Sequence, residues 1–327
     1  MGGPAYYIGN VIGSSFFASV FAVLLAVTYG LIFNSVQANT ISLSMQTSFG
    51  FDTQMTGLAI AGFTALVIFG GLTRIAKVVG VMVPVMAGAY ILVALAVTAL
   101  NITMVPEVLV TIVRCAFDFD AVLGAGFGMA LMTGIKRGLF SNEAGMGSTP
   151  HAHAVARVEH PAEQGLVAMF GVFTTVVIVT FTGIVILVTG VLDFKTTGIE
   201  LTQHAYTVGL GSFGMAFVAV CLFFFAFSTI MGWYFFGEQN VRFLFRSRGV
   251  LAYRVIVCAF IVTGAMLKVD FVWSLADLFN GLMVLPNLVA LVALHKVVGE
   301  SLEDFEKKLD HYEERKSENI DDRMQRL

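Results

Sequence analysis

The chain has 327 residues, of which 57% are hydrophobic and only 13% are charged, and its mean hydropathy is +0.85. Soluble domains carry about 25% charged residues, so this composition excludes an ordinary soluble protein and indicates a chain that lies in lipid. The formal net charge of −3 gives no reason to expect a nucleic-acid partner.

Eight continuous apolar segments predict membrane-spanning helices, because a bilayer core about 30 Å thick needs about 20 apolar residues in helical form. They cover residues 13–34, 55–72, 79–100, 105–135, 166–192, 211–236, 249–267 and 271–294. The connections after the second, fourth and sixth segments carry eight Lys and Arg residues, whereas the opposite connections carry two. Since the positively charged side faces the cytoplasm, both termini of the chain are predicted to be cytoplasmic.

The fourth segment, residues 105–135, is unusually long and contains Gly124, Gly126 and Gly128 within LGAGFG at 123–128. Each glycine weakens a helix by about 1 kcal/mol, so residues 123–128 are predicted to be non-helical or distorted. Unwound backbone in a membrane lines a cavity or is buried in protein, where its polar groups can bind ions and carboxylates. Close helix packing through small residues explains the glycines equally well.

Two later segments carry polar side chains. Ser228 and Thr229 in the sixth are adjacent hydroxyls that could bind a hard monovalent cation, although bonding to their own helix carbonyls is the more common role. Asp277 in the eighth is costly in lipid, and a structural hydrogen bond between helices is slightly preferred for it. His151 and His153 do not complete a zinc site. No nucleophile and base pattern indicates an enzyme.

The composition changes at the end of the last segment. Residues 296–327 mix both charge signs and contain few apolar residues, a pattern typical of a solvated helix or frayed end. The predicted organisation is therefore a transmembrane domain at 1–295 followed by a charged cytoplasmic tail at 296–327.

Four stretches carry a resemblance to a known family. GIKRGLFSNEAGMGS at 134–148 closely resembles the signature of the alanine/glycine:cation symporters. GGPAYYI at 2–8, FAFSTIMGWYFFGE at 225–238 and WSLADLFNGLMVLPNL at 273–288 resemble further motifs of that family. The resemblance implies an all-α transmembrane, leucine-transporter-like fold of inverted repeats, with the eight spans as its third to tenth core helices.

The function implied by the resemblance is sodium-coupled symport of alanine or glycine across the cell membrane, with sodium as the coupling ion and no other cofactor. The substrate residues implied are Gly124, Gly126, Phe127 and Gly128, together with Gln37 and Asn39 in VQANTIS at 36–42. Ser228 and Thr229 are the implied sodium ligands.

The chain departs from the family at its N-terminus, because relatives have further helices before the stretch that matches GGPAYYI. One of those helices supplies part of the substrate and sodium sites. The resemblance therefore implies an N-terminal truncation. A second hypothesis follows, in which the chain is a non-transporting fragment that acts at most as a membrane interaction partner.

Overall fold

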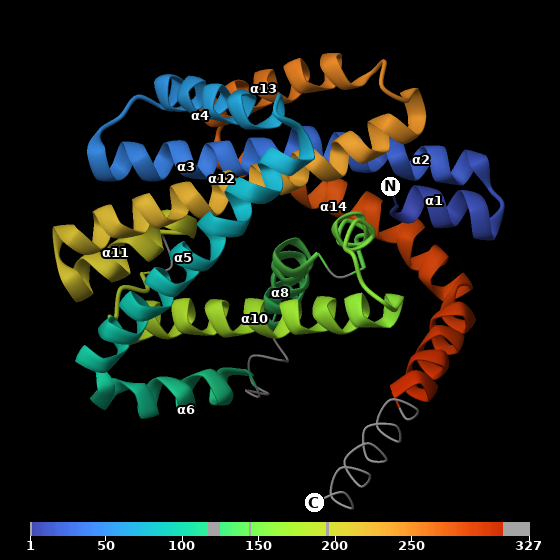
Figure 1. The fold of residues 1–327 in the computed structure, drawn as a ribbon. Coiled ribbons are helices and arrows are strands. Elements are labelled where there is room, and N and C mark those ends of the chain that lie inside the picture. Colours follow the sequence, from blue (N-terminus) through green and yellow to red (C-terminus); the bar gives the residue numbers. More distant parts are fainter. Residues whose placement is uncertain (1, 117–124, 144, 194–195, 310–327) are drawn as a thin grey trace, which may run out of the picture.

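A computed structural model describes the chain except for residues 1, 117–124, 144, 194–195 and 310–327. The described part is helical and contains no strand. Figure 1 shows its elements, which are α1 (Pro4–Tyr7), η1 (Ile8–Ile12), α2 (Ser15–Val27), η2 (Thr28–Phe33), α3 (Asn34–Phe49), α4 (Thr53–Ile68), α5 (Gly71–Leu100), η3 (Ile102–Met104), α6 (Val105–Ala116), α8 (Ala125–Asn142), α9 (Pro150–His153), α10 (Pro161–Val188), α11 (Gly198–Leu210), α12 (Ser212–Phe245), α13 (Val250–Met266) and α14 (Val269–Ala293).

Several of these helices are long and apolar enough to cross a bilayer. Among the described residues the long ones are the continuous run Ser15–Phe49, formed by α2, η2 and α3, and the helices α5, α10, α12 and α14. The helices α4 and α13 are apolar but shorter, with 16 and 17 residues. At 1.5 Å per residue they cover about 25 Å, which is less than the bilayer core. The all-helical prediction is confirmed, and two predicted spans are short helices.

Two other sequence predictions differ from the structure. The predicted span at 105–135 is divided into α6 and α8, which run in different directions (Figure 1). The helix α11 was not predicted, because its sequence GIELTQHAYTVGL contains too many polar residues for a span. It is nevertheless anchored by buried Gln203, Ala205 and Tyr206.

The core lies between the run 15–49 and α12, which pack along each other through the middle of the molecule. The helices α4 and α13 cover one side of this pair, and α5 and α10 lie on the other (Figure 1). Outward-facing apolar side chains are common, and they include Val81 and Val85 on α5 and Phe170 and Phe173 on α10. Exposed apolar surface of this kind is expected where the solvent is lipid.

One buried hydroxyl joins four helical elements in the core, namely α13, α2, η2 and α12. Tyr253 on α13 donates to the carbonyl of Ala26 at 2.9 Å. The hydroxyl lies against Gly30 of η2 and Gly237 of α12, where a Cβ at either position would overlap it. Glycine is therefore required at both positions by the tyrosine that lies between them.

The charged tail begins as a helix at 295–309 and contacts the start of α10. The imidazole of His160 accepts the Ala162 amide through Nδ1, which caps α10. Its Nε2 lies 3.1 Å from the Asp304 carboxylate, and its ring stacks on Phe305. The rest of the predicted tail, 310–327, lies outside the described residues.

Candidate functional site

The glycine segment predicted to bind substrate is only partly described. Gly124 lies outside the described residues. Gly126, Phe127 and Gly128 belong to α8, which is helical from Ala125, so the predicted loss of helix is wrong for these three residues. They occupy the first turn of α8, where the amide groups lack intrahelical acceptors in any helix. Glycines cost little there, which explains why α8 tolerates them.

The other two predicted substrate residues lie on α3. The Asn39 amide is buried and donates to the carbonyls of Gly264 at 3.0 Å and Leu267 at 2.7 Å. It therefore joins α3 to the C-terminal end of α13. Gln37 is partly buried. Since residues two apart in a helix point in widely different directions, Gln37 and Asn39 face different neighbours.

The predicted sodium ligands lie near the middle of α12. Ser228 and Thr229 both donate to the carbonyl of Phe225, at 2.8 and 2.9 Å. This is the back-bonding alternative considered from the sequence. A hydroxyl that donates its proton keeps its oxygen lone pairs, so both oxygens retain the capacity to bind a cation.

A site that the sequence did not predict lies directly after α8, within the signature GIKRGLFSNEAGMGS. Glu143 has a left-handed backbone conformation with φ 58°, and Gly145 and Gly147 both have φ 82°. Non-glycine residues seldom adopt positive φ, so Glu143 is held in place by its surroundings. Residues 143–148, of which residue 144 lies outside the described residues, are called the signature loop below.

The Glu143 carboxylate is the centre of a hydrogen-bond network. The Ser148 hydroxyl donates to it at 2.5 Å, and the Trp233 indole of α12 also donates to it. The Tyr29 hydroxyl of η2 forms a further hydrogen bond to it and lies 3.6 Å from the Met146 sulfur. Burial raises the pKa of the Glu143 carboxyl, and these hydrogen bonds offset part of the rise.

The other family-like stretches meet the same loop. The Tyr7 hydroxyl, from GGPAYYI, donates to Asn287 at 2.5 Å, and the Asn287 amide donates to the carbonyl of Gly145 at 2.9 Å. A Cβ at Gly147 would lie within 3 Å of Pro4 and Asn287. Together with Trp233, these contacts bring all four stretches to one place, although they are far apart in the chain.

Aromatic rings and an ion pair connect α8 to its neighbours. Phe140 packs against Trp233 of α12 and Trp273 of α14. Arg137 lies over the Trp273 ring at 4.3 Å and pairs with Asp277. Asp277 therefore has an interhelical structural contact, as the sequence favoured.

A second charged network lies at the C-terminal end of α12. Glu238 is buried and accepts from Arg242 at 2.8 and 2.5 Å. Its other oxygen accepts from the Tyr234 hydroxyl and lies 3.4 Å from Arg254 of α13. This network neutralises the carboxylate locally and joins α12 to α13.

The two histidines of α9 have structural contacts. The Nδ1 of buried His151 lies 2.9 Å from the Ser148 carbonyl, and its Nε2 lies 2.8 Å from the Asn240 amide. Burial lowers the pKa of His151 to about 4, and its hydrogen bonds oppose that fall. His153 contacts Gln164 at 2.7 Å. No group of three or more potential metal ligands occurs among the described residues.

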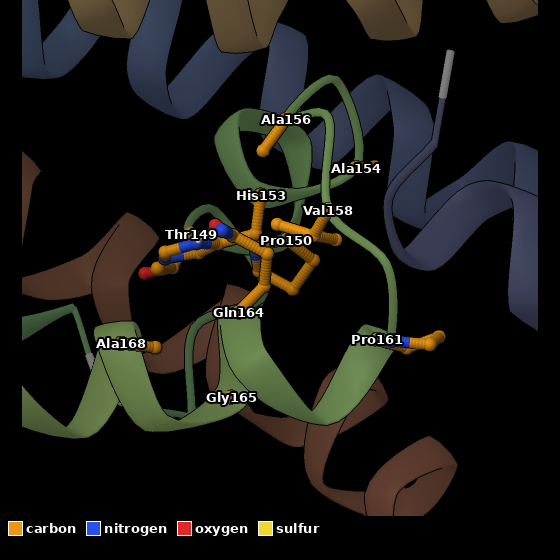
Figure 2. A pocket seen from close by; sticks show the side chains of 10 residues that line it. All are labelled: Thr149, Pro150, His153, Ala154, Ala156, Val158, Pro161, Gln164, Gly165 and Ala168. Carbon is orange, nitrogen blue, oxygen red and sulfur yellow. Dashed lines mark hydrogen bonds between the residues drawn. The ribbon is translucent and has the colours of Figure 1, made fainter. Parts of the chain in front are cut away.

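Two open pockets adjoin this region. One, of about 600 Å³, is lined by Tyr7, Glu143, Gly145 and Asn287 on one wall and by apolar residues of α10 on another. The second, of about 530 Å³, lies between α9 and the start of α10, and Figure 2 shows His153, Pro150 and Gln164 on its wall. The Glu143 carboxylate thus lies beside a pocket large enough for water or a small solute.

Comparison with known proteins gives a consistent result. The chain matches the sodium:alanine symporter family over residues 1–319. It is 44% identical to the amino-acid carrier protein AlsT of Bacillus subtilis (strain 168) over 94% of this chain, and 45% identical to the probable sodium/glutamine symporter GlnT of the same organism over 93%. It is 39% identical to the sodium/alanine symporter AgcS of Methanococcus maripaludis over 91%.

The lengths of these relatives differ from that of the chain. The chain spans 66% of AlsT, 64% of GlnT and 67% of AgcS.

Proposed function

Because the chain belongs to the sodium:alanine symporter family, we propose that it carries out sodium-coupled symport of a small neutral amino acid, alanine or glycine, across the cell membrane. The observation that carries the proposal is the family match over residues 1–319, supported by the convergence of all four family-like stretches on the signature loop. The family consists of transporters, which agrees with the sequence prediction that the chain is not an enzyme.

Sodium is the proposed coupling ion, with Ser228 and Thr229 among its ligands. Both hydroxyl protons are used by the Phe225 carbonyl, so both oxygens can direct lone pairs at a cation. Ser228 is buried, and a desolvated cation depends more strongly on each oxygen ligand than a hydrated one does.

The proposed substrate residues are those predicted from the sequence: Gln37, Asn39, Gly124, Gly126, Phe127 and Gly128. The start of α8 supports this proposal, because the first amides of a helix have no intrahelical acceptors and favour an anion such as an amino-acid carboxylate. Gly126 and Gly128 lack side chains that would block a ligand from those amides.

The proposed arrangement in the membrane is the eight-span, leucine-transporter-like inverted repeat, with both termini in the cytoplasm. The long helical runs and the shorter apolar helices α4 and α13 in the described part of the chain support a multi-pass protein. The charged segment 296–327 is proposed to be a cytoplasmic tail.

The proposal is tested by reconstituting the full chain in liposomes with an inward sodium gradient and measuring uptake of labelled alanine and glycine. We expect gradient-dependent accumulation above that of empty liposomes. Its absence for both amino acids would favour the non-transporting alternative.

The sodium ligands are tested in the same assay. The double change Ser228→Ala and Thr229→Ala is expected to raise the half-saturating sodium concentration about tenfold, which corresponds to about 1.4 kcal/mol. The matched control is Thr174→Ala with Thr180→Ala, two exposed hydroxyls on α10 that also bond to their own helix carbonyls. An unchanged sodium requirement in the first variant would limit Ser228 and Thr229 to helix packing.

A further inference from the structure

The Glu143 carboxylate has no cationic partner in the described structure. Asp277, Glu238 and Asp304 each have a lysine, arginine or histidine within 4 Å, whereas no ion pair among the described residues includes Glu143. Removing an ionised carboxylate from water is costly without a paired charge. Glu143 is half-buried, so this cost applies to it in part and favours binding of a proton.

The hydrogen bonds around Glu143 can be satisfied in either protonation state. Trp233 is a fixed donor, whereas the hydroxyls of Ser148 and Tyr29 can rotate and serve as donor or acceptor. When the carboxyl carries a proton, it can donate to one of these oxygens. The Tyr29 proton then has an alternative acceptor in the Met146 sulfur, 3.6 Å away.

A proton can reach this position from water. Glu143 lines the open pocket of about 600 Å³ beside α10. The other titratable groups that face this region are Tyr29 from η2, Tyr7 from α1, and His151 and His153 from α9. The tyrosines ionise only at high pH. The pocket-facing residues of α10 and α14 are not titratable, and the basic residues of α8 are paired with α14.

The two histidines differ from Glu143 in how they can respond to pH. The Nε2 of His151 faces the Asn240 amide, a donor, so that nitrogen is the acceptor of a neutral ring. His153 is hydrogen-bonded to Gln164 at the edge of the second pocket. Neither histidine is hydrogen-bonded to the Glu143 carboxylate. The hydrogen bonds from Ser148, Tyr29 and Trp233 therefore act on the protonation of Glu143 and not on that of the histidines.

We propose that Glu143 is a reversible proton-binding site, which takes up one proton from water in the adjoining pocket and returns it there during the transport cycle. This inference rests on the proposed function for its place in transport, but proton binding itself does not require transport. Burial, which raises the pKa of this carboxyl, supports it. The ionised state holds the signature loop against α12 and η2 through charge-assisted hydrogen bonds, and protonation weakens them.

The direct test is infrared titration of the full chain in lipid, which detects the C=O stretch of a protonated carboxyl. The variant is Glu143→Gln, whose amide oxygen can still accept from Trp233, and the matched control is Glu159→Gln, an exposed carboxyl in the loop before α10. A band that grows as the pH falls is expected in the wild type, and each variant should lose one component of it, with the component lost from Glu143→Gln growing in at the higher pH. Two lost components that grow in at the same pH would overturn the proposal.

A second variant keeps the carboxyl and changes only one donor. Trp233→Phe removes a hydrogen bond to the ionised form, so the Glu143 band should titrate about one pH unit higher than in the wild type. An unshifted band would contradict the network described above.

Uptake provides the link to transport. The initial rate of sodium-driven uptake is expected to change by up to about tenfold per pH unit in the wild type and in Glu159→Gln, as for a single titrating group. It should be flat in Glu143→Gln. A pH profile that is unchanged in Glu143→Gln would overturn the role in transport. If no protein transports, the proposed function fails, and the infrared titration still decides whether Glu143 binds a proton.

Discussion

Acidification is expected to destabilise the protein through His151. The ring lies between the Ser148 carbonyl and the Asn240 amide, and burial lowers its pKa to about 4 from an ordinary value of 6.5. Below pH 6.5 the unfolded chain therefore binds a proton at His151, whereas the folded chain does not until the pH approaches 4. The contribution of His151 to the free energy of unfolding is fully present above about pH 6.5 and is lost as the pH falls to about 4, by about 3 kcal/mol in total.

The loss has a structural cause that a variant can isolate. A protonated His151 would direct an Nε2 hydrogen at the Asn240 amide, which is itself a donor also bonded to the Phe236 carbonyl. His151→Gln cannot take up a proton, so its free energy of unfolding should lack this loss between about pH 7 and 4. The matched control is His295→Gln, an exposed histidine, which should behave like the wild type.

The assay is chemical unfolding in detergent micelles at several pH values, followed by the fluorescence of the two tryptophans. Comparing variants is necessary because Glu143, whose pKa is raised, stabilises the folded chain on acidification and acts in the opposite sense. Equal losses in the wild type and His151→Gln would refute the assignment to His151.

Two further predictions concern packing in the core. Gly237→Ala should lower the unfolding free energy by about 1–3 kcal/mol, because its Cβ would overlap the Tyr253 hydroxyl. The control Gly232→Ala, whose Cβ would meet no neighbour, should cost less. Adding Tyr253→Phe to Gly237→Ala should restore part of the loss, measured by thermal unfolding. Asn39→Ala should cost about 1–3 kcal/mol, because it removes the two hydrogen bonds by which α3 holds the carbonyls of Gly264 and Leu267. A KM for alanine uptake that stays unchanged would leave Asn39 with a packing role alone.

The helical architecture could be predicted from the sequence because long apolar runs have few alternatives in lipid. The limits of the elements were harder to predict. Loss of helix was expected at the glycines of 123–128, yet Gly126 and Gly128 are helical. Glycine content shows where a helix is weak, whereas the position of a break also depends on neighbouring elements. The helix α11 was missed because hydropathy does not identify a polar helix that is held by tertiary contacts.

The candidate site shows the same limit more clearly. The sequence identified the signature stretch, but it did not single out Glu143, which lies outside the predicted spans and beside glycines. Its importance comes from Tyr29 and Trp233, which are 114 and 90 positions away and reach it only through the fold. An acidic residue among small ones in the strongest motif was the available signal. Asp277, in contrast, could be interpreted correctly, because a carboxylate inside a span needs a partner.

The contact between the tail and α10 has a mechanical consequence. The same imidazole of His160 caps the first turn of α10 and contacts Asp304 of the tail helix. A force applied to the tail, for example by a molecule that binds it and pulls it away, therefore acts on the cap of α10 as well as on α14, to which the tail is joined. The load would pass from Asp304 through one ring to a helix that forms a wall of both pockets.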